Sequence, residues 1–197
     1  MKKIIFLSLL ILVPLFCYAQ DANSVTNELG LNLSGTTFGI RYIGGKGNTL
    51  LRLTFISLGG SNSSSTSSSN TKSKSNSQGL GFNLGFEKRK PVSENLCAYF
   101  GSDLLTSFSR NIYKVSSLSE TSTNLTFSPG LGFVLGFNFK ISSKINISAE
   151  VMPSISYSYT KNTVDNNGTT FKSTSTGFDY GLRTNGLNLT LSYTLGK

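Results

Sequence analysis

The stretch LTFSPGLGFVLGFNF, residues 125–139, decides the fold class. Apart from Pro129, its odd-numbered positions are bulky and apolar, and its even-numbered positions are mainly Gly, Ser, Thr and Asn. A period of two residues is typical of a β-strand, where successive side chains point to opposite faces. The same alternation occurs in residues 29–33, 38–42, 51–55, 80–86, 96–108, 145–159 and 187–195. The sequence therefore predicts an all-β chain.

The two rows of side chains differ in size, and this difference predicts which row faces inward. A barrel of about eight strands has an interior only just wide enough to be filled by side chains, so the bulky rows of all the runs cannot point into it together. The row of Gly, Ser, Thr and Asn fits a narrow lumen, but it is too poor in Lys and Glu for the outer face of a soluble protein. In lipid, an apolar exterior and a closed sheet are both required. We therefore predict an antiparallel transmembrane β-barrel, with a secreted soluble β-sandwich as the alternative.

The N-terminus has the features of an export signal. Lys2 and Lys3 precede an apolar run, residues 4–16, and a small residue, Ala19, stands before a polar segment. This pattern predicts a signal peptide over residues 1–19 and a barrel domain over residues 20–197, located in the bacterial outer membrane. Only Cys97 then remains, so the domain cannot contain an internal disulfide.

The expected number of strands is eight, because bacterial outer-membrane barrels have an even number of strands. Nine runs alternate, counting residues 28–33 as the first, so two must form one strand. We expect residues 178–183 and 187–195 to form one bent final strand, since the apolar positions change parity between them as across a β-bulge. The polar segments 61–78, 110–124 and 161–170 are expected to be long surface loops.

Six charged residues fall on the row of small side chains. These are Arg41, Arg52, Asp103, Glu150, Asp179 and Arg183. Three bases and three acids would balance in a lumen that disfavours unpaired charge. We predict that they form a network of ion pairs that plugs the barrel; the alternative is that they line a wet interior without specific pairing.

Composition argues against catalysis and against cofactor or metal binding. The chain has no His, which is the commonest acid–base residue and metal ligand, so no catalytic, cofactor-binding or metal-binding residue is predicted and the protein is not expected to be an enzyme. Charged residues make up only 14%, and the net charge is +9. The cations do not alternate with aromatic residues as in single-strand nucleic-acid binders, so nucleic acid is not an expected partner. A basic balance instead suits contact with anionic lipopolysaccharide.

Several segments resemble the small outer-membrane β-barrel proteins of Bacteroidota, which are distantly similar to the OmpA/OmpX type without a C-terminal peptidoglycan-binding domain. They are Tyr18-Ala19-Gln20, residues 88–96, Ser128-Pro129-Gly130-Leu131-Gly132-Phe133 with residues 145–150, and residues 187–195. The resemblance implies outer-membrane lipid and the outer-membrane assembly machinery as partners. Such chains commonly end in an aromatic residue, whereas this one ends in Leu195-Gly196-Lys197.

Two functions remain open at this point. Eight strands leave no open channel, and the expected outer loops are rich in Ser, so the first is a structural or surface-interaction role, adhesion-like, with an extracellular ligand bound by the Ser-rich loops. The second is transport through a small pore, which requires a wider interior.

Overall fold

The computed structural model describes residues 25–34, 37–66, 72–115, 120–182 and 187–195. The predicted signal peptide lies outside these residues. The described chain forms ten antiparallel segments: β1 (Val25–Ser34), β2 (Thr37–Lys46), β3 (Thr49–Thr66), β4 (Lys72–Pro91), β5 (Leu96–Val115), β6 (Glu120–Lys140), β7 (Ile145–Val151), β8 (Ser154–Asn166), β9 (Thr169–Gly181) and β10 (Leu187–Thr194). Among the described residues, no helix is long and apolar enough to cross a membrane.

The ten segments make eight strands. β6 pairs with β7 over one part of its length and with β8 over the next, so β7 and β8 lie end to end, separated by Met152 and Pro153. β9 pairs with β8 and β10 pairs with β7, so β9 and β10 also lie end to end. This arrangement agrees with the prediction of eight strands, and β9 and β10 take the places expected for the two parts of the last strand; residues 183–186 between them lie outside the described residues. Gly181, with φ of 119°, ends β9 at the bend, a conformation that residues with a side chain rarely adopt.

The sheet closes on itself. Its first and last segments, β1 and β10, are paired from Glu28↔Thr194 to Ser34↔Asn188, and β5 pairs with β6 on the other side of the ring. A closed ring of paired strands is a barrel, so the alternative of a β-sandwich is wrong.

The predicted assignment of the two rows is correct. The bulky row faces outward: Phe133, Leu135 and Phe137 are 55–57% exposed on the outer wall. The row of small residues faces the lumen, where Asn32, Thr54 and other polar side chains are buried. A soluble protein buries most of its apolar side chains and exposes polar ones. Here the polar side chains are buried and the apolar ones are exposed, as expected for a barrel surrounded by lipid.

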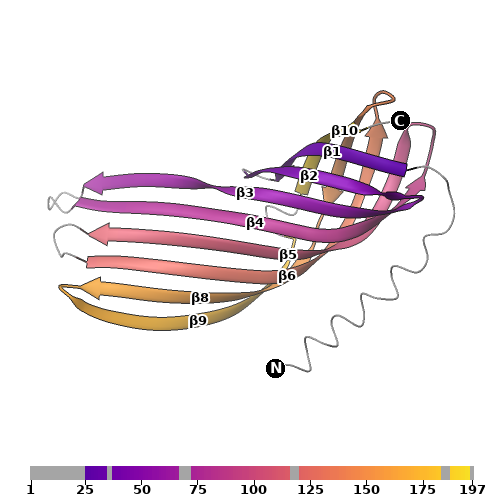
Figure 1. The fold of residues 1–197 in the computed structure, drawn as a ribbon. Coiled ribbons are helices and arrows are strands. Elements are labelled where there is room, and N and C mark those ends of the chain that lie inside the picture. The colour runs from indigo at the N-terminus through magenta and orange to yellow at the C-terminus, as the bar shows by residue number, and fades with distance from the viewer. Residues whose placement is uncertain (1–24, 35–36, 67–71, 116–119, 183–186, 196–197) are drawn as a thin grey trace, which may run out of the picture.

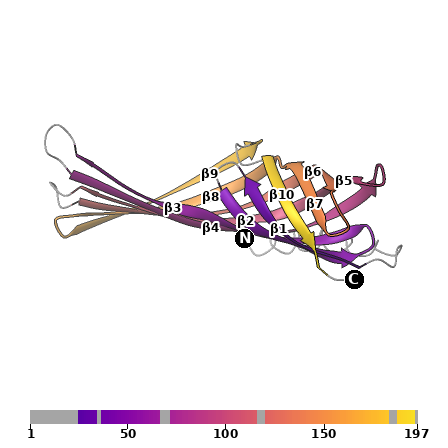
Figure 2. The same cartoon turned by 90° about the horizontal axis from the view of Figure 1, so that it is seen from above.

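Six of the segments run far beyond the barrel (Figures 1 and 2). β3, β4, β5, β6, β8 and β9 continue side by side past the ends of β1, β2 and β10 as one sheet. We call its outer part, residues 60–66, 72–78, 110–115, 120–125, 161–166 and 169–174, the extension. The residues of β3 in the extension pair only with β4, and β9 pairs only with β8, so among the described residues this sheet has two open edges.

The expected long loops are therefore wrong. The described residues of segments 61–78, 110–124 and 161–170 are almost all paired strand. The connection that the structure describes there is the two-residue turn Asn167-Gly168, where both residues have positive φ. The exposed apolar side chains of the outer wall form a band around the barrel, which we call the apolar belt. The apolar alternation ends where these strands leave this belt. The hydrogen-bonded ladder continues, because Ser, Thr and Asn side chains can stand on either face of a sheet in water.

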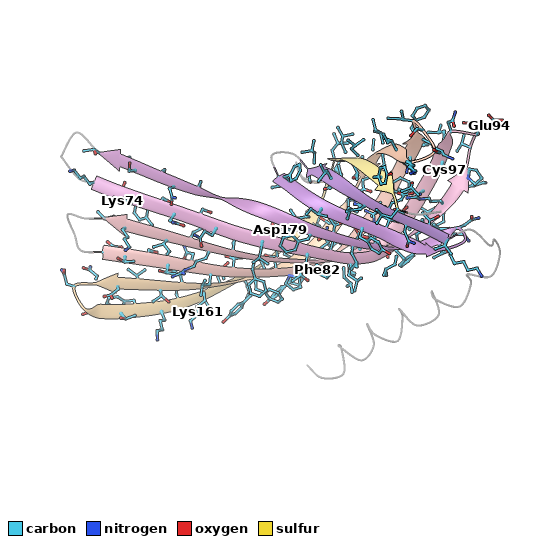
Figure 3. The ribbon with its side chains drawn as sticks, turned by 45° about the horizontal axis from the view of Figure 1, so that its top comes forward. Lys74, Phe82, Glu94, Cys97, Lys161 and Asp179 are labelled. Atoms are coloured by element: carbon cyan, nitrogen blue, oxygen red, sulfur yellow. The ribbon has the colours of Figure 1, made fainter. Side chains whose placement is uncertain are left out.

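The other end of the barrel carries the short connections. The turns Gly47-Asn48, 92–95 and 141–144 lie there, next to the start of β1 and the end of β10. Figure 3 shows Glu94 and Cys97 at this end and Lys74 and Lys161 on the extension, so the molecule has a short-turn end and an extended end. Cys97 is half-buried and free.

Candidate functional site: a charged cluster in the lumen

Eight functional side chains meet inside the barrel near its short-turn end. Period-two alternation places all of them on the lumen row, and they come from six segments: Glu28 of β1, Arg41 of β2, Arg52 of β3, Glu87 and Arg89 of β4, Tyr99 and Asp103 of β5, and Glu150 of β7. Six of the seven charged members are at most 4% exposed. Arg89 is the most exposed charged member, with 15% of its side chain exposed. We call this group the charged cluster.

Glu150 is the centre of the charged cluster. Arg41 binds its carboxylate with both terminal nitrogens, at 2.7 Å from Nη2 to Oε1 and 3.1 Å from Nη1 to Oε2. Arg52 Nη2 donates to both oxygens at 3.0 Å. The hydroxyl of Tyr99 and the amide of Asn188 donate to the same carboxylate at 2.9 and 3.1 Å. Such charge-assisted and bidentate bonds are the strongest hydrogen bonds in proteins, so Glu150 ties β7 to four other segments.

Arg52 extends the charged cluster toward β4 and β5. Its Nη1 donates to Glu87 at 2.9 Å, and its guanidinium lies 5.9 Å from the centre of the Tyr99 ring. Its Nε is 3.2 Å from Asp103 Oδ1, yet the geometry makes no hydrogen bond. Neither oxygen of Asp103 accepts a hydrogen bond from a described residue, although Asp103 is only 1% exposed. Asp103 is thus held by charge alone.

Arg89 links the charged cluster to β1. Its Nε donates to Glu87 at 2.6 Å, and its terminal nitrogens donate to the two oxygens of Glu28 at 2.7 and 3.0 Å. Arginine and carboxylate therefore alternate without a break along Arg41, Glu150, Arg52, Glu87, Arg89 and Glu28. With Asp103 the cluster has four acids and three bases.

Glycines make room for these long side chains. A Cβ on Gly136 would stand 2.5 Å from the ring of Tyr99, and a Cβ on Gly85 would meet the carboxylate of Asp103. Steric space therefore explains why glycine occupies these lumen-facing positions: the narrow lumen has room for the long charged side chains and for Tyr99 where the neighbouring strands carry no side chain.

A cavity of about 150 Å³ lies on the side of the charged cluster that faces the extension. Asn32, Asn83 and Asn188 line it together with Ile56 and Leu105, and Arg41 borders it. Because Arg41 donates to Glu150 and Thr54, its guanidinium is already engaged within the protein. Among the described residues, no group of three or more His, Cys, Asp or Glu side chains could hold a metal ion.

Four of the six residues predicted for the lumen network come together: Arg41, Arg52, Asp103 and Glu150. Asp179 does not join them, because it lies on β9 opposite Ser156, beyond the bend and on an exposed surface. Arg183 lies outside the described residues.

Sequence reasoning missed Glu28, Glu87, Arg89 and Tyr99. The signal for Glu87 was available, since it continues the lumen row of Asn83 and Gly85. Tyr99 likewise stands between two outward residues of β5, Ala98 and Phe100. The expected balance of three bases and three acids is therefore not the composition of the observed cluster.

Comparison with known proteins supports the fold. No protein-family model matches the chain, and no curated protein matches its sequence. Among solved structures, a major outer membrane protein from Thermus thermophilus is 12% identical and superposes with a TM-score of 0.56, covering 88% of this chain and all of that one. CarO2 of Acinetobacter baumannii (11% identical, 88% of this chain and 100% of that chain covered, TM-score 0.44) and Neisserial surface protein A (15%, 87% and 94%, 0.37) also match. The likeness to the Thermus protein shows that the two chains share a fold, a small β-barrel.

Proposed function

We propose that this protein is an exported outer-membrane β-barrel whose lumen is plugged by the charged cluster and whose extension is displayed at the cell surface, in a structural or surface-interaction role. The single observation that supports a plugged lumen is the unbroken series of buried Arg–carboxylate contacts from β1 to β7. The sequence resemblance to Bacteroidota proteins of the OmpA/OmpX type supports the same role and export by the signal peptide.

The outer wall supports residence in a membrane. Large apolar side chains are exposed on every segment of the closed barrel, for example Leu31 on β1, Phe55 on β3, Phe100 on β5 and Leu189 on β10. An exposed apolar surface that encircles a monomer is unfavourable in water and favourable in hydrocarbon. Short periplasmic turns and longer outer segments are typical of such barrels, so the extension is assigned to the outside.

Conductance in a planar bilayer tests the plug. The folded wild-type protein is expected to give no steady ion current. Replacing Arg52 and Glu150 by Ser removes the two central side chains and is expected to open a measurable path. The matched control replaces Phe133 and Leu135 on the outer wall by Ala, a double truncation that leaves the lumen intact.

Steady current through the wild-type barrel would replace the plugged role by the alternative of a small pore, with the cavity beside Arg41 as part of the path. An unchanged, silent trace for the Arg52 and Glu150 double variant, with folding verified by gel mobility, would show that other groups close the lumen.

The surface role is tested on intact cells. An epitope inserted in the connection between β3 and β4 is expected to react with antibody without permeabilisation. Loss of adhesion to a host or matrix surface when this hairpin is shortened, with the barrel still assembled, would identify the extension as the interacting part. Reaction only after permeabilisation would reverse the proposed orientation.

A further inference from the structure

All the basic residues of the extension lie on one face of its sheet. They are Lys72, Lys74, Arg110, Lys114, Lys161 and Lys172, all exposed. The number of each differs by an even value from that of an outward-facing apolar residue on the same strand, such as Phe108 for Arg110 and Tyr159 for Lys161, so the two side chains point to the same face. The same face carries one acid, Asp165, and none of the six bases forms an ion pair with a described residue. This outward face is therefore strongly cationic and unpartnered.

The first row of cations stands directly above a row of aromatic rings. Phe108, Phe127 and Tyr159 are register partners across β5, β6 and β8, and the rings of the first two lie 4.7 Å apart. Aromatic residues mark the membrane–water interface in outer-membrane barrels. The next outward row is Arg110↔Leu125↔Lys161. In the proposed membrane location, these two cations, which flank Leu125 immediately beyond the aromatic row, stand at the depth of lipid headgroups.

A second cationic level lies four residues farther along the strands. Lys74 and Lys114 are direct register partners on β4 and β5, and like charges directly opposite each other destabilise a sheet. They border a groove of about 440 Å³ together with Asn62, Ser64 and Asn76. Lys74 and Lys161 are both visible on the extension in Figure 3. No acid lines this groove, so an anion from outside the chain would relieve the repulsion.

We propose that the outward face of the extension is a docking surface for the phosphorylated headgroup of an outer-leaflet glycolipid. Arg110 and Lys161 contact a phosphate close to the acyl chains, and Lys74 and Lys114 contact an anionic group farther out on the same headgroup, roughly 13 Å along the strand. The aromatic row and Leu125 contact the acyl chains. This continuity of apolar, aromatic and cationic rows favours an amphiphile over a free anion. The inference rests on the proposed membrane location and orientation.

The test compares charge-removing variants of the folded, detergent-purified barrel for binding of diphosphorylated lipid A. Each cation near an anionic headgroup contributes about fivefold to affinity, so Arg110→Ala with Lys161→Ala is expected to weaken binding roughly 25-fold. The matched control, Lys88→Ala with Lys90→Ala, removes two exposed cations at the short-turn end and is expected to leave affinity unchanged. The exchange Arg110→Lys with Lys161→Arg keeps the charge and should retain most of the binding.

Two further arms identify the ligand chemistry. Lipid A with its phosphates removed is expected to bind weakly, and inorganic phosphate is expected to compete poorly. Equal affinity of wild type and the Arg110 and Lys161 variant, or equal binding of the dephosphorylated lipid, would overturn the proposal. Full competition by inorganic phosphate would show a free-anion site instead. The gel shift of unheated samples and the accessibility of the β3–β4 epitope on intact cells report on membrane location and orientation without any lipid A, so failure of the docking surface and failure of the proposed location or orientation are distinguishable.

Discussion

Removal of the Glu150 carboxylate tests whether the charged cluster is dry. In Glu150→Ala, Arg41 loses the carboxylate that its terminal nitrogens bind, and the donors of Tyr99 and Asn188 lose their acceptor. Breaking a buried ion pair costs about 3–5 kcal/mol. An unsatisfied neutral donor adds about 1–3 kcal/mol. We therefore expect the free energy of unfolding to fall by at least about 4 kcal/mol, whereas a pair reached by water would cost about 1 kcal/mol or less.

A double-mutant cycle separates direct coupling from general damage. Arg41→Ala leaves Glu150 with Arg52, Tyr99 and Asn188, so it is expected to cost less than Glu150→Ala. The double variant removes both charges and should cost less than the sum of the single changes, by about 0.5–3 kcal/mol. Glu150→Gln keeps an acceptor and provides a milder variant if Glu150→Ala does not fold.

The measurement is denaturant unfolding in lipid vesicles, followed by circular dichroism and by the folded band of unheated samples in detergent gels. Glu94→Ala is the matched control, since Glu94 lies exposed in a short turn (Figure 3) and should change stability by no more than about 0.5 kcal/mol. A loss of about 1 kcal/mol or less for Glu150→Ala, together with additive double variants, would refute a dry, coupled cluster and favour a wet lumen.

The remaining predictions concern the wall, the glycines and the extension. The folded protein should migrate differently before and after boiling and fractionate with outer membranes; recovery as a soluble periplasmic species would contradict the membrane proposal. Phe133→Arg, in the middle of the apolar belt, should cost about 2–4 kcal/mol in lipid, and Thr174→Arg on the extension much less, so equal costs would contradict the assigned depth. Gly136→Ala should displace the Tyr99 ring and lower stability, as a denaturation midpoint would report, while Gly177→Ala, next to only the Ser158 hydroxyl, should have a small effect. Shortening the β3–β4 hairpin to a turn near residues 60–78 should leave the gel shift of the barrel intact, and loss of folding would mean that the extension stabilises the barrel.

The fold was predictable because the barrel imposes one chemical rule on each row. Phe133 and Leu135 must face lipid while Gly132 and Gly136 face the lumen, and this rule is visible at every second residue. Outside the apolar belt the rule no longer applies. Residues 61–78 are polar on both faces, so their sequence carries no signal that distinguishes a loop from a paired hairpin.

The charged cluster was predictable in part, because alternation gives the face of a residue but not its height along the barrel. Arg52 and Glu150 lie at the same height along the barrel because of the registers of the four strand pairings that connect β3 to β7. Asp179 points to the same face of the sheet but lies farther along the barrel, on β9 opposite Ser156. Glu28 and Arg89 were missed for a related reason. They stand near the ends of the alternating runs, where the polar flanks obscure the lumen row.

The seam between β1 and β10 has a kinetic consequence. It joins residues more than 150 positions apart, so the ring cannot close before the last strand of the chain has arrived. Contacts of such high sequence separation slow folding, because the entropy of closing the loop is lost before the contacts form. The charged cluster draws Glu28 and Glu150 from the two sides of this seam, and Asn188 of β10 donates a hydrogen bond to Glu150. Until closure, some of its charges face the bilayer or water without partners, and completion of the ion pairs and completion of the ring become one late, cooperative event.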